Sequence, residues 1–142
     1  MRKELLNTFD KELLLKDLCG RLPYGVKVLC LRDFNRKWYN LKMVDVEDNE
    51  VYLTTTDKSY TNRYVEIEEV KPYLFPLSSM TEEQCKELEE IDPEFYSLIC
   101  SNGEIYVSMD LRGYDWLNKN HFDYRGLIPK GLAIDATGLN IY

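Results

Sequence analysis

Apolar residues near the N-terminus recur at helical spacing. Leu14 and Leu18 lie one turn apart in the segment KELLLKDLC, and Thr8 or Asp10 can accept hydrogen bonds from the unpaired amides of a first turn. A glycine follows Cys19, and glycine commonly ends a helix. The pattern therefore predicts a short N-terminal helix that ends near Cys19.

The period then changes to that of β-strands. Four runs rich in β-branched and aromatic residues are separated by the turn-forming clusters DFNR, DVEDN and DKSYTN; the runs span residues 26–32, 37–44, 50–55 and 63–70. The first run is apolar on both sides, which indicates a strand buried on both faces. A meander around such a strand predicts a small antiparallel barrel of SH3-like or Sm-like shape, with VKPYLF as a short closing edge strand.

Alternation within two of these runs predicts which side chains face the core. In the second run, Tyr39, Leu41 and Met43 alternate with polar residues and are predicted on one face. In the fourth run, Val65 and Ile67 alternate with glutamates in the same way. Each of these strands is therefore expected to have one face in water.

The second half of the chain has helical signals again. Thr81 followed three residues later by Gln84 is a capping box, so a helix is predicted over residues 82–91. Cys85 and Leu88 are expected on its buried side.

Further helical signals follow, and the chain then ends in an apolar segment. Asp92 and Pro93 predict the start of another short helical piece, and Asp110 is placed to cap a helix over residues 111–120. Residues 127–142 are too apolar for a solvated tail. They are expected to dock against the body in extended form.

Together these elements predict an α+β fold in a single domain over residues 1–142. Residues 1–76 supply the N-terminal helix and the barrel, and residues 77–142 supply a helical region with the docked C-terminal tail. An apolar share of 44% in 142 residues is enough for one core. No apolar run approaches the roughly 18 residues of a membrane span. The charged residues near the N-terminus are unlike the middle of a secretion signal, so a cytoplasmic location is expected.

The spacing of cysteines and glycines contains no motif for a metal or a nucleotide. Cys19, Cys30, Cys85 and Cys100 form no CxxC pair, so they are expected to be free thiols. The glycines form neither GxGxxG nor GxxxxGK[ST]. The sequence therefore predicts no metal and no cofactor.

His121, the one histidine, is the best candidate for acid–base chemistry. It lies two residues before Asp123, so one interpretation is a base held by a carboxylate. No nucleophile motif accompanies the pair, and a structural role for His121 is the preferred interpretation. An enzyme that uses these residues with Asp115 or Tyr124 ranks behind the binding functions.

Charge is distributed unevenly along the chain, whose formal net charge is −7. Residues 21–42 are locally basic, and residues 82–94 are strongly acidic. The acidic stretch is either a solvated helix or a mimic of a phosphate backbone. The basic stretch contains a basic-aromatic hairpin of Phe34, Arg36, Lys37, Trp38 and Tyr39. Such a hairpin can contact phosphates and stack on bases, or its aromatic residues can belong to the core. The net negative charge opposes the nucleic-acid interpretation.

Three stretches resemble a family of uncharacterised proteins from Bacteroidales phages, prophages and host genomes. They are KELLLKDLCGRLPYGVKV, VKPYLFPLSSMTEEQ and DWLNKNHFDYRGLIPKGLAIDATGLNIY. The resemblance implies a bacterial intracellular setting and a phage origin, with no known activity, cofactor or catalytic residue to transfer.

The function predicted from these features is that of a non-enzymatic protein-binding accessory module. Absent catalytic motifs and abundant aromatic residues favour it, since Tyr, Trp and Arg anchor interfaces. The alternative is a nucleic-acid-binding accessory protein that uses the basic-aromatic hairpin. No catalytic residue is assigned; the binding candidates are Phe34, Arg36, Lys37, Trp38, Tyr39, His121, Asp123 and Arg125.

Overall fold

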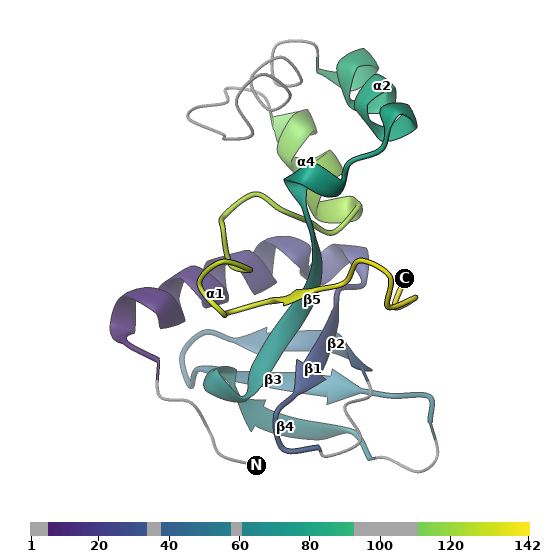
Figure 1. Ribbon diagram of the computed structural model, residues 1–142. Helices are drawn as coiled ribbons and strands as arrows, with labels where there is room; N and C mark the ends of the chain where they lie inside the picture. Colours follow the sequence, from purple (N-terminus) through teal and green to yellow (C-terminus); the bar gives the residue numbers. More distant parts are fainter. Residues whose placement is uncertain (1–5, 34–37, 58–60, 93–110) are drawn as a thin grey trace.

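The computed structural model has an α+β fold, and it describes residues 6–33, 38–57, 61–92 and 111–142 (Figure 1). Its helices are α1 (Thr8–Arg21), α2 (Glu82–Ile91) and α4 (Leu111–Lys119), and short 3₁₀ turns cover Leu22–Tyr24, Ile67–Glu69 and Leu77–Ser79. Its strands are β1 (Lys27–Cys30), β2 (Trp38–Asp45), β3 (Glu50–Thr54), β4 (Arg63–Glu66), β5 (Val70–Pro76), β6 (Phe122–Asp123) and β7 (Ile134–Asp135). The predicted segments at residues 34–37 and 93–110, with Asp110 and Cys100, lie outside the described residues.

The N-terminal helix is confirmed, with different ends from those predicted. Its N-cap is Asn7, whose side chain accepts a hydrogen bond from the Asp10 amide, so the predicted cap at Thr8 or Asp10 is wrong. The helix continues to Arg21 because Leu14, Asp17, Leu18 and Arg21 share its buried face. The chain then turns through Gly25, whose φ of 70° is readily adopted by glycine.

The strands form one mixed sheet in the order β4–β3–β2–β1–β5–β6, with β7 also paired to β5. Within the group of strands from β1 through β5, every pair of neighbours is antiparallel, whereas β6 and β7 run parallel to β5. Along the described strands, no pairing joins β4 to the far end of the sheet, so the sheet is not closed into a barrel. The predicted α+β class and the meander of four strands are confirmed at this level.

β5 is not an edge strand, which corrects the prediction for VKPYLF. It pairs with β1 on one side, and β7 pairs with it on the other. The Leu31 amide donates to the Glu69 carbonyl. Because the bonds of an antiparallel ladder alternate, the backbone nitrogen of Lys71 points toward β1 and that of Pro72 points away from it. A proline is tolerated there because the ladder requires no donor at that position.

A β-bulge in β2 changes the predicted pattern of inward side chains. Leu41 lies opposite Leu53, but Met43 lies opposite Tyr52, so β2 has one more residue than β3 in this interval. The extra residue moves Met43 to the outer face of the sheet, whereas Tyr39 and Leu41 are buried. The prediction that these three side chains share one face is therefore wrong for Met43. Val65 and Ile67 are buried as predicted.

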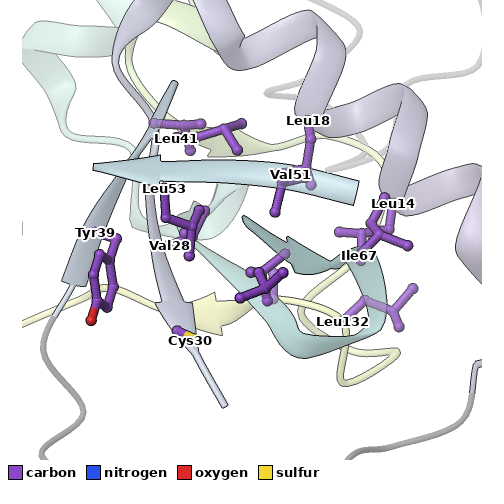
Figure 2. Packing of buried hydrophobic residues seen from close by; sticks show 14 of the residues in the cluster. Leu14, Leu18, Val28, Cys30, Tyr39, Leu41, Val51, Leu53, Ile67 and Leu132 are labelled. Carbon is purple, nitrogen blue, oxygen red and sulfur yellow. The ribbon is translucent and has the colours of Figure 1, made fainter. Parts of the chain in front are cut away.

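The main core lies between α1 and the inner face of the curled sheet. Figure 2 shows Leu14 and Leu18 of α1 on one side of a cluster that contains side chains from β1, β2 and β3. Leu127 and Leu132 from the C-terminal segment join the same core. A second cluster combines Leu88 of α2 with residues of α4 and β6. The C-terminal segment thus docks against the body as predicted, but not in extended form, because residues 127–133 run through turns before the two-residue strand β7.

The capping box of α2 provides a test of the local sequence signal. The helix covers residues 82–91 as predicted, and Thr81 and Gln84 exchange side-chain bonds with each other's backbone amides. Thr81→Ala is expected to lower the free energy of unfolding by about 1 kcal/mol in urea denaturation, because one amide loses its acceptor. Thr81→Ser retains the oxygen and is the control. Equal stability of the two variants would show that the cap contributes nothing.

Candidate functional site

The described part of the basic-aromatic hairpin divides between the two faces of the sheet. Phe34, Arg36 and Lys37 lie outside the described residues. Trp38 is half-buried on the outer face, with Lys27 Nζ 4.0 Å from its ring centroid. Tyr39 points into the core and is 1% exposed. The structure therefore leaves Trp38, and not Tyr39, able to contact a partner.

The surroundings of Tyr39 hold its ring in place. Figure 2 shows this ring at the end of the cluster nearest to the start of β2. The Arg63 guanidinium lies 5.8 Å from the ring centroid and forms an ion pair with Asp33 at 3.3 Å. Burial and the Asp33 carboxylate both raise the pKa of Tyr39. Its hydroxyl is therefore neutral at neutral pH and has a structural role.

Asp123 organises the backbone that follows it. Its carboxylate oxygens accept hydrogen bonds from the amides of Leu127 and Ile128, each at 2.9 Å. These amides lie in the turn that directs Leu127 into the main core. These two hydrogen bonds from backbone amides explain why a carboxylate is buried at this position without a catalytic role.

His121 is held by stacking. It follows α4 with a φ of 63°, a left-handed conformation that costs a non-glycine residue about 1 kcal/mol. Its ring stacks on that of Tyr142, with centroids 3.6 Å apart. Nδ1 of His121 has no hydrogen-bond partner in the part of the chain that the structure describes. The histidine ring thus supports the docked C-terminal segment.

The environment of His121 disfavours its protonated form. Burial is the largest cause, and the nearby charges of Arg21 and Lys27 add to it, so the pKa of His121 falls to about 4. An unfolded chain binds this proton near pH 6.5. Between the two values the unfolded state therefore holds more protons than the folded state, and stability falls as pH decreases.

The expected result is a loss of about 1–2 kcal/mol of unfolding free energy through His121 between pH 7 and pH 5. Carboxylates also titrate in acid, so the wild type is compared with His121→Gln by urea denaturation at both pH values. The difference between the two proteins isolates the histidine. A pH dependence that is the same in both would contradict the buried, neutral state of His121.

A buried ionic cluster joins α1 to the segment after α4. The Asp17 and Arg21 side chains are both 0% exposed, and Arg21 Nε lies 2.8 Å from an Asp17 oxygen. Arg21 also donates to the Phe122 carbonyl at 2.6 Å, and Arg125 forms an ion pair with Asp17 at 3.4 Å. Both guanidinium groups lie near the face of Tyr124. Arg125, predicted as a binding residue, therefore contributes to this internal cluster.

The pKa of Asp17 reflects two opposed effects in this cluster. Burial raises it, while the charge and hydrogen bond of Arg21 and the charge of Arg125 act to lower it, with a net increase. The patterns in the sequence did not predict this cluster. Its signal was an oppositely charged pair four residues apart on the same helix face as Leu14 and Leu18.

The Tyr142 hydroxyl connects the C-terminal segment to two strands. It accepts a hydrogen bond from the Lys27 amide and donates to the Tyr73 carbonyl, each at 2.9 Å. Lys27 Nζ donates to the Ile141 carbonyl. On the outer face of β1 and β5, Ile134, Ala136 and Ile141 pack in one cluster with Leu29 and Tyr73. The docked segment therefore covers this part of the face.

The outer face of β2, β3 and β4 carries a row of large side chains. Met43 lies opposite Tyr52, and Tyr52 lies opposite Tyr64, whose ring centroid is 4.6 Å from that of Tyr52. Tyr64 is 55% exposed and Met43 is 42% exposed. Val46, in the turn after β2, is also exposed. We call Met43, Tyr52 and Tyr64 the exposed row.

A row of carboxylates lies beside the exposed row. Asp45 lies opposite Glu50, and Glu50 lies opposite Glu66. Each is two residues along its strand from a member of the exposed row, and side chains two apart share a face. We call Asp45, Glu50 and Glu66 the acidic row. The two rows form the candidate site, because they place apolar, aromatic and charged groups together on an accessible surface.

Among residues 6–33, 38–57, 61–92 and 111–142, no group of three or more His, Cys, Asp or Glu side chains is arranged to hold a metal ion. None of the described helices is both long and apolar enough to cross a membrane.

Comparisons of the chain with protein-family models, with curated proteins and with solved structures found no match. The resemblance to proteins of Bacteroidales phages and their hosts therefore stays a prediction.

Proposed function

We propose that this protein is a non-enzymatic accessory module that binds another protein through the outer face of β2, β3 and β4. The observation that carries the proposal is the exposed row of Met43, Tyr52 and Tyr64. A β-bulge turns Met43 outward, and bulges commonly re-aim side chains next to functional sites. Tyrosine and methionine are enriched where proteins contact one another.

Burial elsewhere supports this choice of surface. The outer face of β1 and β5 is already covered by the C-terminal segment, and the inner face is covered by α1. His121, Asp123 and Arg125 have structural partners, so they are not needed for a binding role. The exposed row is therefore the apolar surface we assign to a partner.

The nucleic-acid alternative has less support at this surface. The acidic row lies beside the tyrosines, and carboxylates repel phosphate groups. In the basic stretch, Arg21 and Arg32 bind Asp17 and Glu69 within the protein. Lys42 is the exposed cation that remains on β2, and Arg36 and Lys37 lie outside the described residues.

The proposal extends to the type of sheet and to the setting of the protein. A 3₁₀ turn separates β4 from β5, and β1 lies between β2 and β5; this order supports a partly open barrel of the SH3-like or Sm-like kind. Cys19, Cys30 and Cys85 are free thiols, which fits a reducing cytoplasm. A phage or prophage origin is part of the same proposal and rests on the sequence resemblance.

Truncation of one tyrosine tests the binding surface. A partner recovered from a lysate of the native organism is purified, and its affinity is measured by calorimetry. We expect Tyr64→Ala to weaken binding by about 2 kcal/mol, as for an aromatic anchor that the partner buries. The fold should survive because a cross-strand pair contributes only about 0.2–1 kcal/mol.

Phe9→Ala is the matched control for this experiment. Phe9 is an exposed aromatic residue on α1, which covers the inner face of the sheet, opposite to the exposed row (Figure 1). Its truncation should leave the affinity unchanged. Equal effects of the two variants, or no effect of Tyr64→Ala, would refute binding through the exposed row.

A further inference from the structure

The acidic row is an arrangement that strand pairing does not favour. Asp45, Glu50 and Glu66 face one another directly across three neighbouring strands. Like charges in such positions are destabilising, whereas opposite charges there are stabilising. Asp45 also accepts a hydrogen bond from the Asp48 amide, and Arg32 and Glu66 attract each other, but strand pairing itself does not favour three carboxylates in register.

The turn between β2 and β3 adds further negative charge at the same end of the sheet. Glu47 and Asp48 are both exposed there, next to the exposed Val46. Nearby basic groups are engaged within the protein: Arg32 is bonded to Glu69, and Arg63 is paired with Asp33. Lys42, at the bulge, is the exposed cation on β2. Carboxylates thus predominate around the exposed row.

The neighbouring tyrosines suit a cationic side chain. The carboxylate of Glu66 and the ring of Tyr64 start about 7 Å apart on the same face of β4. A lysine or arginine can lie along a tyrosine ring while its charged end reaches a carboxylate. Arginine can also bind a carboxylate with two parallel hydrogen bonds. The two rows together therefore match a side chain that is apolar along its stem and positive at its end.

We infer that the partner's docking segment is basic and binds with its Lys or Arg side chains across the exposed row and the acidic row. This inference rests on the proposed function and names the partner chemistry of the same surface. The net charge of −7 attracts such a segment over long range. A second copy of this chain is a poor occupant, because the two acidic rows would repel each other.

Short synthetic peptides of alternating arginine and valine provide the test, with glutamine in place of arginine in a second peptide. Binding is followed by fluorescence anisotropy and by chemical-shift changes in the full chain. The arginine peptide is expected to bind and to shift the Tyr52 and Tyr64 signals. Its affinity should fall about tenfold or more in the Glu50→Gln/Glu66→Gln variant, since each charge-assisted contact is stronger than a neutral one.

Two controls separate this contact from general attraction between opposite charges. Glu89→Gln/Glu90→Gln removes the same charge from exposed positions on α2 and should leave the affinity within about twofold. Tyr64→Ala should also weaken binding of the arginine peptide. An equal loss in the Glu89/Glu90 variant, equal binding of the glutamine peptide, or no binding of the arginine peptide would overturn the inference.

The outcomes also separate this inference from the proposed function. If the natural partner depends on Tyr64 but not on Glu50 and Glu66, the surface is correct and the basic character of its partner is wrong. If neither the natural partner nor the arginine peptide responds to Tyr64→Ala, both are wrong. Tighter binding of a short single-stranded DNA than of the arginine peptide would also overturn the inference.

Discussion

Arg21→Met is expected to lower the free energy of unfolding by about 3–5 kcal/mol, or to leave the protein unfolded. The Asp17 and Arg21 side chains are fully buried and bonded to each other, and Arg21 also donates to the Phe122 carbonyl. Methionine fills much of the arginine volume but supplies no charge and no donor. The Asp17 carboxylate then stays buried with only Arg125 to oppose its charge. Urea denaturation followed by circular dichroism measures the effect.

The double variant Asp17→Leu/Arg21→Met is the control for this prediction. Replacing both partners of a buried ion pair with apolar residues is often close to neutral, because no charge is left alone. The double variant should therefore be more stable than Arg21→Met. A single variant that loses less than about 1 kcal/mol would show that the pair does not hold α1 to the segment after α4.

Removal of residues 127–142 is expected to yield an unstable or aggregating protein. Leu127 and Leu132 belong to the main core, and Ala136 is buried on the outer face. Burial of one large aliphatic side chain contributes about 1.5–3 kcal/mol, so the loss of the two leucines alone is comparable with the roughly 5–15 kcal/mol by which domains are stable. In the truncated chain, β5 would also lose its pairing with β7. Thermal unfolding and size-exclusion chromatography measure the outcome.

Two point variants keep this prediction testable if the truncated chain cannot be purified. Leu127→Ala removes a fully buried side chain and should cost about 2–5 kcal/mol. Leu139→Ala changes a half-exposed residue of the same segment and should cost less than about 0.5 kcal/mol. A soluble truncated chain with an unshifted melting temperature would contradict the docked arrangement.

Strong local signals in the sequence predicted most of the fold. The capping box at Thr81 and Gln84 defined α2 correctly, because both bonds lie within four consecutive residues. The strand periods likewise identified β1 to β4. By contrast, β6 and β7 are two-residue strands, too short to show a period. Their pairing with β5 depends on tertiary contacts, and for that reason β5 was mistaken for an edge strand.

The candidate site was harder to predict for a specific physical reason. Strict alternation places Met43 on the same face as Leu41, but one extra residue in β2 reverses the side of the sheet on which Met43 lies. Nothing in the residue types of β2 marks that bulge. The acidic row, in turn, depends on the register of three strands, which alternation alone does not specify. Tyr39 shows the opposite case. Its place beside charged residues suggested a binding surface, but its side chain is buried in the core.

Site-specific crosslinking tests the central claim most directly. A photo-reactive amino acid is placed at position 64, 38 or 9 of the full chain, and the protein is irradiated together with its purified partner. Position 64 reports on the exposed row, position 38 on the predicted hairpin, and position 9 on the solvent-exposed side of α1. We expect a strong crosslink from position 64 and little from position 9. A crosslink from position 38 with none from position 64 would contradict the claim that this protein binds its partner through the outer face of β2, β3 and β4.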